Sequence, residues 1–198
     1  MTAAEKLKPQ TDPSDPVPGV EALVQSTLAP QTVEIDRQGT YPAGFMRELG
    51  ALGGYRQHLG SGGARGPSGP GNFGNAVRVM DAVSSECMST GFCVWCQDAL
   101  GWYLENADDT SVRDHLLPGI ADGSQLGGTG LSNALKHFAS IEALKIRLRR
   151  VDGGYVANGT LPWVSNLAND HAFAAIFQVE GSDRKVMALT FCDQPGFS

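Results

Sequence analysis

The sequence predicts an α+β protein in which an N-terminal all-α helical domain is followed by an antiparallel β-barrel or β-sandwich domain. Up to about residue 123 the apolar residues recur with the 3.6-residue period of helices, and beyond it they alternate with a period of two. Turn signals separate the later segments. Because helices and strands are segregated along the chain, a parallel nucleotide-binding sheet is not expected. We place an arm at residues 1–19 and the domains at residues 20–123 and 124–198.

The first helices are expected after the proline-rich arm. Residues 1–19 contain few apolar side chains, and we expect them to be disordered. The next helix begins at residue 20, and one stripe at helical spacing contains Val20, Leu23, Val24, Thr27 and Leu28. Another helix is predicted over residues 42–52, which Gly53 and Gly54 end, and its inner face contains Phe45, Met46 and Leu49.

A loop and further helices are predicted next. Glycine and proline dominate residues 60–74, which favours a mobile surface loop. Residues 75–106 should form two helices with a break near Ser89-Thr90-Gly91. The second of them, at 92–104, is apolar on nearly every side, as is typical of a helix sandwiched in a core. A shorter helix should begin at residue 109 or 110, with Val112, Leu116 and Leu117 inward.

The strands are expected in the last third of the chain. Leu144, Ile146 and Leu148 alternate with basic residues, which is the clearest strand pattern in the sequence. Turn signals at 152–154, 158–159 and 181–183 predict hairpin connections. The further strands are predicted at residues 154–158, 161–165, 172–180 and 185–192.

Composition limits the classes of partner and compartment. Of 198 residues, 41% are hydrophobic and 18% charged, with a net charge of -6. No stretch reaches the roughly 20 apolar residues of a membrane-spanning helix, and an acidic chain repels phosphate backbones. We therefore expect neither membrane nor nucleic acid as a partner. The first residues lack the apolar core of a signal peptide, so we expect a cytoplasmic protein with free thiols.

Motifs for metal or covalent catalysis are weak. Cys93 and Cys96 have CxxC spacing, but no second ligand pair accompanies them, and their apolar neighbours favour a buried helix. The four histidines are scattered singly, so no metal site is predicted. No serine stands in a GxSxG sequence.

Four segments, taken in order, resemble the acyl-CoA dehydrogenase family. The most specific is GGYVANGTLPWVSN at 153–166, which is similar to the family's dgyvlnGtK.W[IV][TS]N. The others are IDRQGTYP at 35–42, ELGALGG at 48–54 and HLLPGIADG at 115–123. The resemblance implies a helical domain and a middle β domain that is incomplete here. It also implies that the C-terminal helical bundle, which carries the catalytic base, lies outside this chain, so no catalytic residue is nominated.

The resemblance further implies FAD as the cofactor. Trp163 would offer an aromatic face to the flavin ring, and Ser165 would offer a hydroxyl and an N–H beside the reactive flavin N5. The family's L-T-E-P motif, which binds the flavin pyrimidine, falls on Leu131, Ser132 and Asn133. The alternative for Trp163 is a buried core aromatic. The helix that lines the family's substrate cavity would contribute Phe92, Cys96 and Leu100, although these residues also suit a plain core.

One departure leaves the substrate open. The family's G-S-D motif falls on Phe138-Ala139-Ser140, so its glycine and serine are lost, although Lys136 and His137 could supply positive charge. The first hypothesis is the N-terminal portion of an FAD-dependent acyl-CoA dehydrogenase-like oxidoreductase. The alternatives are a flavin monooxygenase or oxidase acting on a small non-CoA molecule, and a non-catalytic truncated chain that binds a partner subunit. We expect a homo-oligomer or association with a chain that supplies the bundle.

Overall fold

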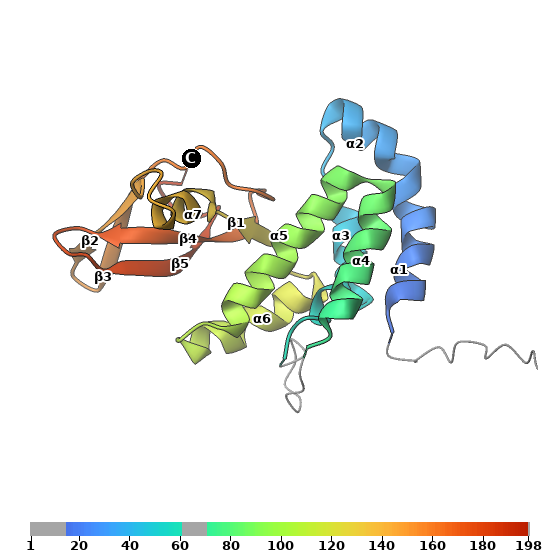
Figure 1. Ribbon diagram of the computed structural model, residues 1–198, viewed down its shortest axis with the longest axis horizontal. Helices are drawn as coiled ribbons and strands as arrows, with labels where there is room; N and C mark the ends of the chain where they lie inside the picture. The colour runs from blue at the N-terminus through green and yellow to red at the C-terminus, as the bar shows by residue number, and fades with distance from the viewer. Residues whose placement is uncertain (1–14, 61–70, 198) are drawn as a thin grey trace, which may run out of the picture.

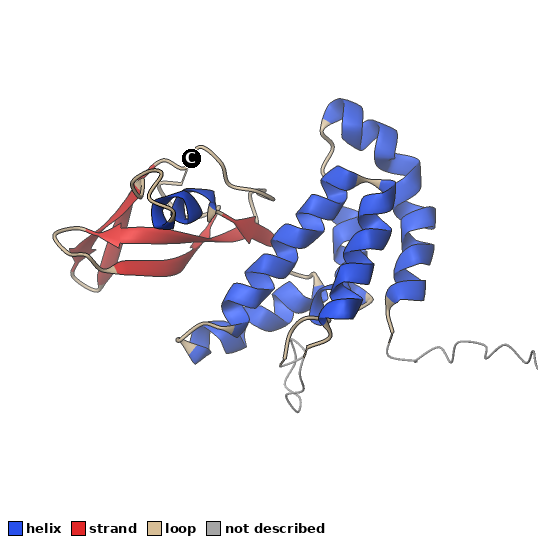
Figure 2. Cartoon of the chain, viewed as in Figure 1, coloured by secondary structure: helices blue, strands red, loops and turns tan. Residues whose placement is uncertain are grey.

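The computed structural model describes residues 15–60 and 71–197, and in it a helical half is followed by a sheet half (Figure 1; Figure 2). The helical half contains α1 (Val17–Leu23), α2 (Thr32–Gln38), α3 (Ala43–Ala51), α4 (Phe73–Glu86), α5 (Met88–Glu105) and α6 (Thr110–Asp122). The sheet half contains β1 (Gly127–Thr129), α7 (Ser132–Phe138), β2 (Ile146–Val151), β3 (Gly154–Gly159), β4 (Ala172–Val179) and β5 (Lys185–Phe191). The predicted order of a helical region before a β region is therefore confirmed.

The N-terminal helix begins earlier than the sequence pattern predicts. Residues 17–19, which we expected in the disordered arm, form the first turn of α1, while residues 1–14 lie outside the described part of the chain. The side chain of Asp15 accepts a hydrogen bond of 3.0 Å from the backbone N–H of Val17, and Pro18 fits the first turn of a helix. The predicted stripe is right, because Val20, Val24 and Leu28 are completely or almost completely buried.

The region around the glycine-rich segment is only partly as predicted. Of the expected loop at 60–74, residues 61–70 lie outside the described residues, and Phe73 and Gly74 already belong to α4. The break between α4 and α5 falls at Cys87, whose backbone is extended, rather than at residues 89–91. Gly91 lies inside α5, where a side chain would collide with Ser84 of α4. This glycine therefore permits close helix packing and does not end a helix.

Helix α5 connects the two halves of the molecule and lies between the α1–α4 helices and the sheet (Figure 1). Val94 joins the core of the helical half, and Leu100 joins a second cluster that includes Ala174 of β4. One face of α5 is nevertheless open, which corrects the expectation of a helix sandwiched on all sides. Its exposed large apolar side chains are Met88 (73%), Phe92 (51%), Trp95 (45%) and Trp102 (42%).

The sheet is mixed, so the prediction of an antiparallel domain holds for only part of it. The hairpins β2–β3 and β4–β5 are antiparallel, as the turn signals predict. Along one edge of β4, however, β1 pairs in parallel at residues 172–174 and β2 pairs in parallel at residues 178–179. Longer connections, including α7, carry the chain back between these strands, and such connections allow parallel pairing.

One predicted strand does not form. Residues 161–165 contribute only an isolated bridge between Ser165 and Thr129 of β1. Pro162 has no N–H to donate to a ladder, which explains why the segment does not continue β3.

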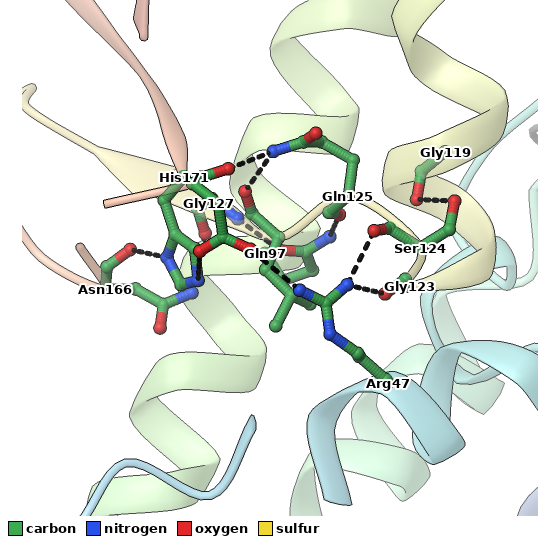
Figure 3. A network of polar contacts seen from close by, with 11 residues as sticks. Arg47, Gln97, Gly119, Gly123, Ser124, Gln125, Gly127, Asn166 and His171 are labelled. Carbon is green, nitrogen blue, oxygen red and sulfur yellow. Dashed lines mark hydrogen bonds and ion pairs between the residues drawn. The ribbon is translucent and has the colours of Figure 1, made fainter. Parts of the chain in front are cut away.

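Gln97 ties α5 to the chain that enters the sheet (Figure 3). Its side chain is fully buried, and its Nε2 donates to the carbonyls of Ile120 and Gln125, both at 2.9 Å. Its Oε1 accepts from the N–H of Gly127, also at 2.9 Å. One side chain therefore satisfies three buried backbone groups between α6 and β1.

Arg47 of α3 makes a second, exposed connection at the same junction (Figure 3). Its guanidinium donates to the carbonyls of Gly123 and Ser124 and forms an ion pair of 2.9 Å with Asp170, the residue that precedes His171 and β4. Gln125 donates to the carbonyl of Asp170 at 2.7 Å. Because the ion pair is exposed, it contributes less to stability than the buried Gln97.

The helical half also buries an ionisable pair. His58 Nδ1 lies 3.7 Å from Asp98 Oδ1, both side chains are 6% exposed, and His58 Nε2 donates to the backbone carbonyl of Asp98 at 2.9 Å. Neither Asp98 oxygen nor His58 Nδ1 has a hydrogen-bond partner among the described residues. Burial raises the pKa of Asp98 well above its usual value and lowers the pKa of His58. Both shifts favour the uncharged forms, a neutral carboxyl beside a neutral imidazole.

Replacing Gln97 by leucine should destabilise the chain by about 2 to 5 kcal/mol, because three backbone groups lose their partner inside the protein. Urea denaturation followed by circular dichroism measures the change. The matched control is Gln38→Leu at the exposed end of α2, which should stay within about 0.5 kcal/mol of the wild type. Equal effects of the two substitutions would contradict the role given to Gln97.

The His58–Asp98 pair predicts a specific pH dependence of stability. A carboxyl group whose pKa is raised in the folded state takes up a proton on folding, so stability falls as pH rises above the ordinary carboxyl range. Between pH 6.5 and 8 we expect a loss of up to about 1.4 kcal/mol per pH unit. Asp98→Asn should flatten this slope, as measured by urea titrations across the range.

The control for this experiment is Asp109→Asn, at the start of α6. The pKa of Asp109 is lowered, chiefly by its hydrogen bond with the Ser111 hydroxyl, so its titration lies below the tested range. This variant should keep the wild-type slope between pH 6.5 and 8. A wild-type slope in Asp98→Asn would show that the buried pair does not control the pH dependence.

Candidate functional site

The candidate site surrounds the end of β1, where two predicted cofactor segments come together. The N–H of Ser165 donates to the Thr129 carbonyl at 3.1 Å, and the N–H of Thr129 donates to the Ser165 carbonyl at 3.3 Å. A side chain on Gly128 would overlap the Ser165 carbonyl, so the close approach depends on glycine there. Leu131 follows Thr129 by two residues, which places segment 131–133 beside the segment that contains Ser165.

Ser165 has its N–H engaged in this bridge, so its hydroxyl is the group left for another role. The hydroxyl interacts with the thiol of Cys96 on α5, and this interaction lowers the thiol pKa slightly. Burial acts in the opposite direction with a larger effect and raises the pKa of Cys96 to about 12. Cys96 therefore stays a neutral thiol that packs under Ser165, without nucleophilic character.

Trp163 lies on the connection between β3 and β4 and is 69% exposed. The alternative interpretation as a buried core aromatic is therefore wrong. A tryptophan that leaves most of its indole in water presents an apolar face that another aromatic group can cover. Because Trp163 is only two residues before Ser165, that face belongs to the same segment that meets β1.

The residues of segment 131–133 differ in burial and in hydrogen bonding. Ser132 is exposed as the first residue of α7, and Leu131 is half-buried. Asn133 is buried, its Nδ2 donates to Glu142 Oε1 and to the Ala143 carbonyl, and its Oδ1 accepts from the N–H of Lys145, each at 3.0 Å. The side-chain amide of Asn133 therefore fixes the turn between α7 and β2, and it stabilises the backbone of segment 131–133.

The three predicted pocket residues of α5 do not share one environment. Cys96 and Leu100 are completely buried against the end of the sheet, where Leu100 lies next to Gly127. Phe92 is exposed and stacks on Trp95 with ring centroids 5.6 Å apart. Cys96 and Leu100 thus form the floor beneath β1 and Ser165, whereas Phe92 belongs to the open face of α5.

Two residues that the sequence analysis did not single out complete the surroundings of β1. The hydroxyl of Tyr103 lies 3.1 Å from Thr129 Oγ1, and Gln97 binds the N–H of Gly127. The signal for Gln97 is its position as an uncharged polar residue within a mostly apolar helix. Nothing in the local pattern distinguishes Tyr103, because its partner lies 26 residues away in sequence.

The charges near α7 are largely paired with each other. Lys145 Nζ lies 3.1 Å from Glu142 and Lys136 Nζ lies 3.9 Å from it, and His137 donates to the Glu142 carbonyl. The pKa of Glu142 is lowered, first by the Asn133 hydrogen bond and then by Lys145.

In residues 15–60 and 71–197 no group of three or more His, Cys, Asp or Glu side chains could hold a metal ion. None of the helices described in those ranges is long and apolar enough to span a membrane.

Comparison with protein families identifies one that matches more than half of the chain. A family model described as the acyl-CoA dehydrogenase N-terminal domain matches residues 18–124. The benzylmalonyl-CoA dehydrogenase of Aromatoleum aromaticum is 26% identical over 177 residues, which cover 86% of this chain and 45% of that protein.

Solved structures show the same fold. A glutaryl-CoA dehydrogenase from Mycobacterium smegmatis, in complex with FADH2, aligns with a TM-score of 0.75 and 24% identity over 93% of this chain and 46% of its own. Butyryl-CoA dehydrogenase from Megasphaera elsdenii aligns with a TM-score of 0.77 and 18% identity, over 92% of this chain and 49% of its own. The chain thus spans about half the length of the relatives that it matches.

Proposed function

The chain belongs to the acyl-CoA dehydrogenase family, and from this membership we propose that it supplies the helical and sheet parts of an FAD-dependent oxidoreductase site. The observation that carries the proposal is the exposed Trp163 on the segment that returns to β1 through Ser165. An aromatic face can cover a flavin ring and a hydroxyl can hydrogen-bond its polar edge, which are the roles that the family resemblance implies for this segment. The cofactor residues that we propose are Leu131, Ser132, Asn133, Trp163 and Ser165.

The side chains around β1 carry the chemical groups that could bind a flavin. Trp163 would cover one face of the ring, the exposed Ser132 hydroxyl would bond its polar edge, and Asn133 would hold the backbone of that segment in place. When bound, FAD would accept a hydride from the substrate. No residue of the described chain is assigned as the base, so this chain's role in the proposal is to bind and orient.

We propose a small organic substrate, with an acyl thioester as the first class to test. Several relatives are named as acyl-CoA dehydrogenases. The lost glycine and serine at residues 138–140 weaken the expectation of a CoA ester, and Lys136 is partly neutralised by Glu142 at 3.9 Å. A non-CoA substrate is therefore the second candidate. Of the proposed pocket residues of α5, Phe92 would reach the substrate from the open face, and the fully buried Cys96 and Leu100 would support the pocket from beneath.

The open face of α5 supports the proposal of a partner helix. One stripe of α5 follows the 4-3-4-3 spacing of a helix that packs along another helix. It consists of Ala99 and the exposed side chains of Met88, Phe92, Trp95 and Trp102. We call these five side chains the α5 seam. An exposed apolar stripe of this length is typical of an interface. We propose that the seam binds a helix of another copy or of a chain that supplies a helical bundle.

The flavin site predicts that the chain binds FAD and that Trp163→Ala weakens binding about tenfold, because the ring loses its aromatic neighbour. Fluorescence titration of FAD measures the dissociation constant. The control is Tyr155→Ala, which removes an exposed aromatic of β3 outside the proposed site. Equal dissociation constants for the two variants would contradict the assignment of Trp163, and absence of saturable binding to the wild type would contradict the cofactor proposal.

The substrate class is tested with this chain in complex with the chain that supplies the helical bundle. Anaerobic bleaching of the bound flavin by an acyl thioester would support dehydrogenation of a CoA ester. Oxygen consumption by the reduced protein with a small aromatic or heteroatom substrate, and no bleaching by thioesters, would support the non-CoA alternative.

The α5 seam predicts concentration-dependent association of the purified chain or of the chain with its partner. Trp95→Gln should weaken that association at least tenfold, since aromatic residues at the centre of an interface contribute most of its affinity. Sedimentation velocity measures the effect, and Val77→Gln, which changes an exposed apolar residue of α4, is the control. If both variants associate as the wild type does, the seam is not the interface.

A further inference from the structure

Asn166 stands out because its backbone is left-handed and both of its side-chain atoms face other elements. Its φ is 62°, and Ser140 is the other non-glycine residue with a positive φ in the described part of the chain. This conformation is uncommon outside glycine, but asparagine tolerates it better than most residues. The turn at Asn166 directly follows Ser165, so it determines how Ser165 approaches β1.

The side-chain amide of Asn166 reaches the first residue of β1. Its Nδ2 donates to the carbonyl of Gly127 at 2.6 Å (Figure 3). On the other side of the same residue, the N–H of Gly127 donates to Gln97. Gly127 is therefore held from α5 and from the 163–166 segment at once, and a side chain there would collide with the Ala172 carbonyl and Leu100.

The main chain of Asn166 is held as well. His171 is 2% exposed, and its Nδ1 donates to the Asn166 carbonyl at 2.9 Å. This bond closes the loop between Ser165 and β4, so the backbone on both sides of Asn166 is tied to the sheet. With Nδ1 donating, His171 Nε2 faces Asp170 at 3.8 Å.

Two distant sequence motifs meet at Asn166. Tyr41, from the segment before α3, packs edge-on against His171 with ring centroids 5.4 Å apart, and its hydroxyl faces the Asn166 side chain. Among the described residues, Tyr41 Oη and Asn166 Oδ1 have no hydrogen-bond partner of good geometry. Asn166 thus touches the helical half, the β1 strand and the entrance to β4.

We propose that Asn166 is a positioning residue that sets Ser165 and Trp163 against β1 for the flavin, through its bond to the Gly127 carbonyl. The inference deepens the proposed function and rests on it. Asn166 acts through its neighbours: its amide bonds Gly127, and its left-handed turn returns Ser165 to Thr129.

The test replaces Asn166 by glycine, which adopts the same φ without strain but lacks the amide donor. We expect Asn166→Gly to fold, to raise the dissociation constant of FAD about threefold to tenfold, and to change the absorbance spectrum of the bound flavin. The matched control is Tyr41→Phe, which removes the hydroxyl facing Oδ1 and keeps the bond to Gly127, and its flavin spectrum should equal that of the wild type.

The outcomes distinguish failure of the positioning role of Asn166 from failure of the proposed flavin site. If the wild type binds FAD and Asn166→Gly binds it with the same constant and spectrum, the positioning role is overturned and the proposed function stands. If the wild type does not bind FAD, the proposed function and the inference both fall. Should the glycine variant not fold, Asn166→Asp, which tolerates the left-handed turn and lacks the donor, is measured in its place with the same expectation.

Discussion

The close contact between α5 and β1 is the constraint on which the rest of the structure depends. Gly127 and Gly128 have no side chains, and any side chain on either would overlap Ala172, Leu100 or Ser165. Gln97 satisfies polar backbone groups at this contact by binding the N–H of Gly127 and the carbonyls of Ile120 and Gln125. A buried helix can approach a strand end this closely only when the strand lacks side chains and its backbone groups keep hydrogen-bond partners.

This contact gives the candidate site its form. Because β1 is fixed on α5, Ser165 is fixed by its bridge to Thr129, and segment 131–133 leaves the strand at a defined point. The thiol of Cys96 interacts with the Ser165 hydroxyl, and the Tyr103 hydroxyl lies beside the Thr129 hydroxyl of β1. The side chains of Trp163 and Ser132 remain exposed to solvent. The helical half contributes a rigid floor, and the sheet half contributes the groups proposed to meet the cofactor.

Sequence patterns predicted what depends on short-range periodicity. The buried faces of α1 and α3 and the hairpins β2–β3 and β4–β5 follow from residues within a few positions of each other. Patterns could not show that β1 and β2 share one edge of β4, because pairings that join residue 127 to 172 and residue 147 to 178 leave no local signal. They also missed the role of Gly91, where a glycine interpreted as a break permits contact with Ser84. For the candidate site, the resemblance proposed the segments, but only the structure shows that Asn133 is engaged and Trp163 is exposed.

Native-state hydrogen exchange of the Gly127 amide tests the central claim most directly. If the α5–β1 contact holds the two halves together, this amide exchanges only when the whole chain unfolds, with a protection free energy equal to that from urea denaturation. The Ser165 amide, bonded to Thr129, should be protected to a similar degree. Exchange of Gly127 through local opening, far faster than that of amides in the middle of α5, would contradict the account.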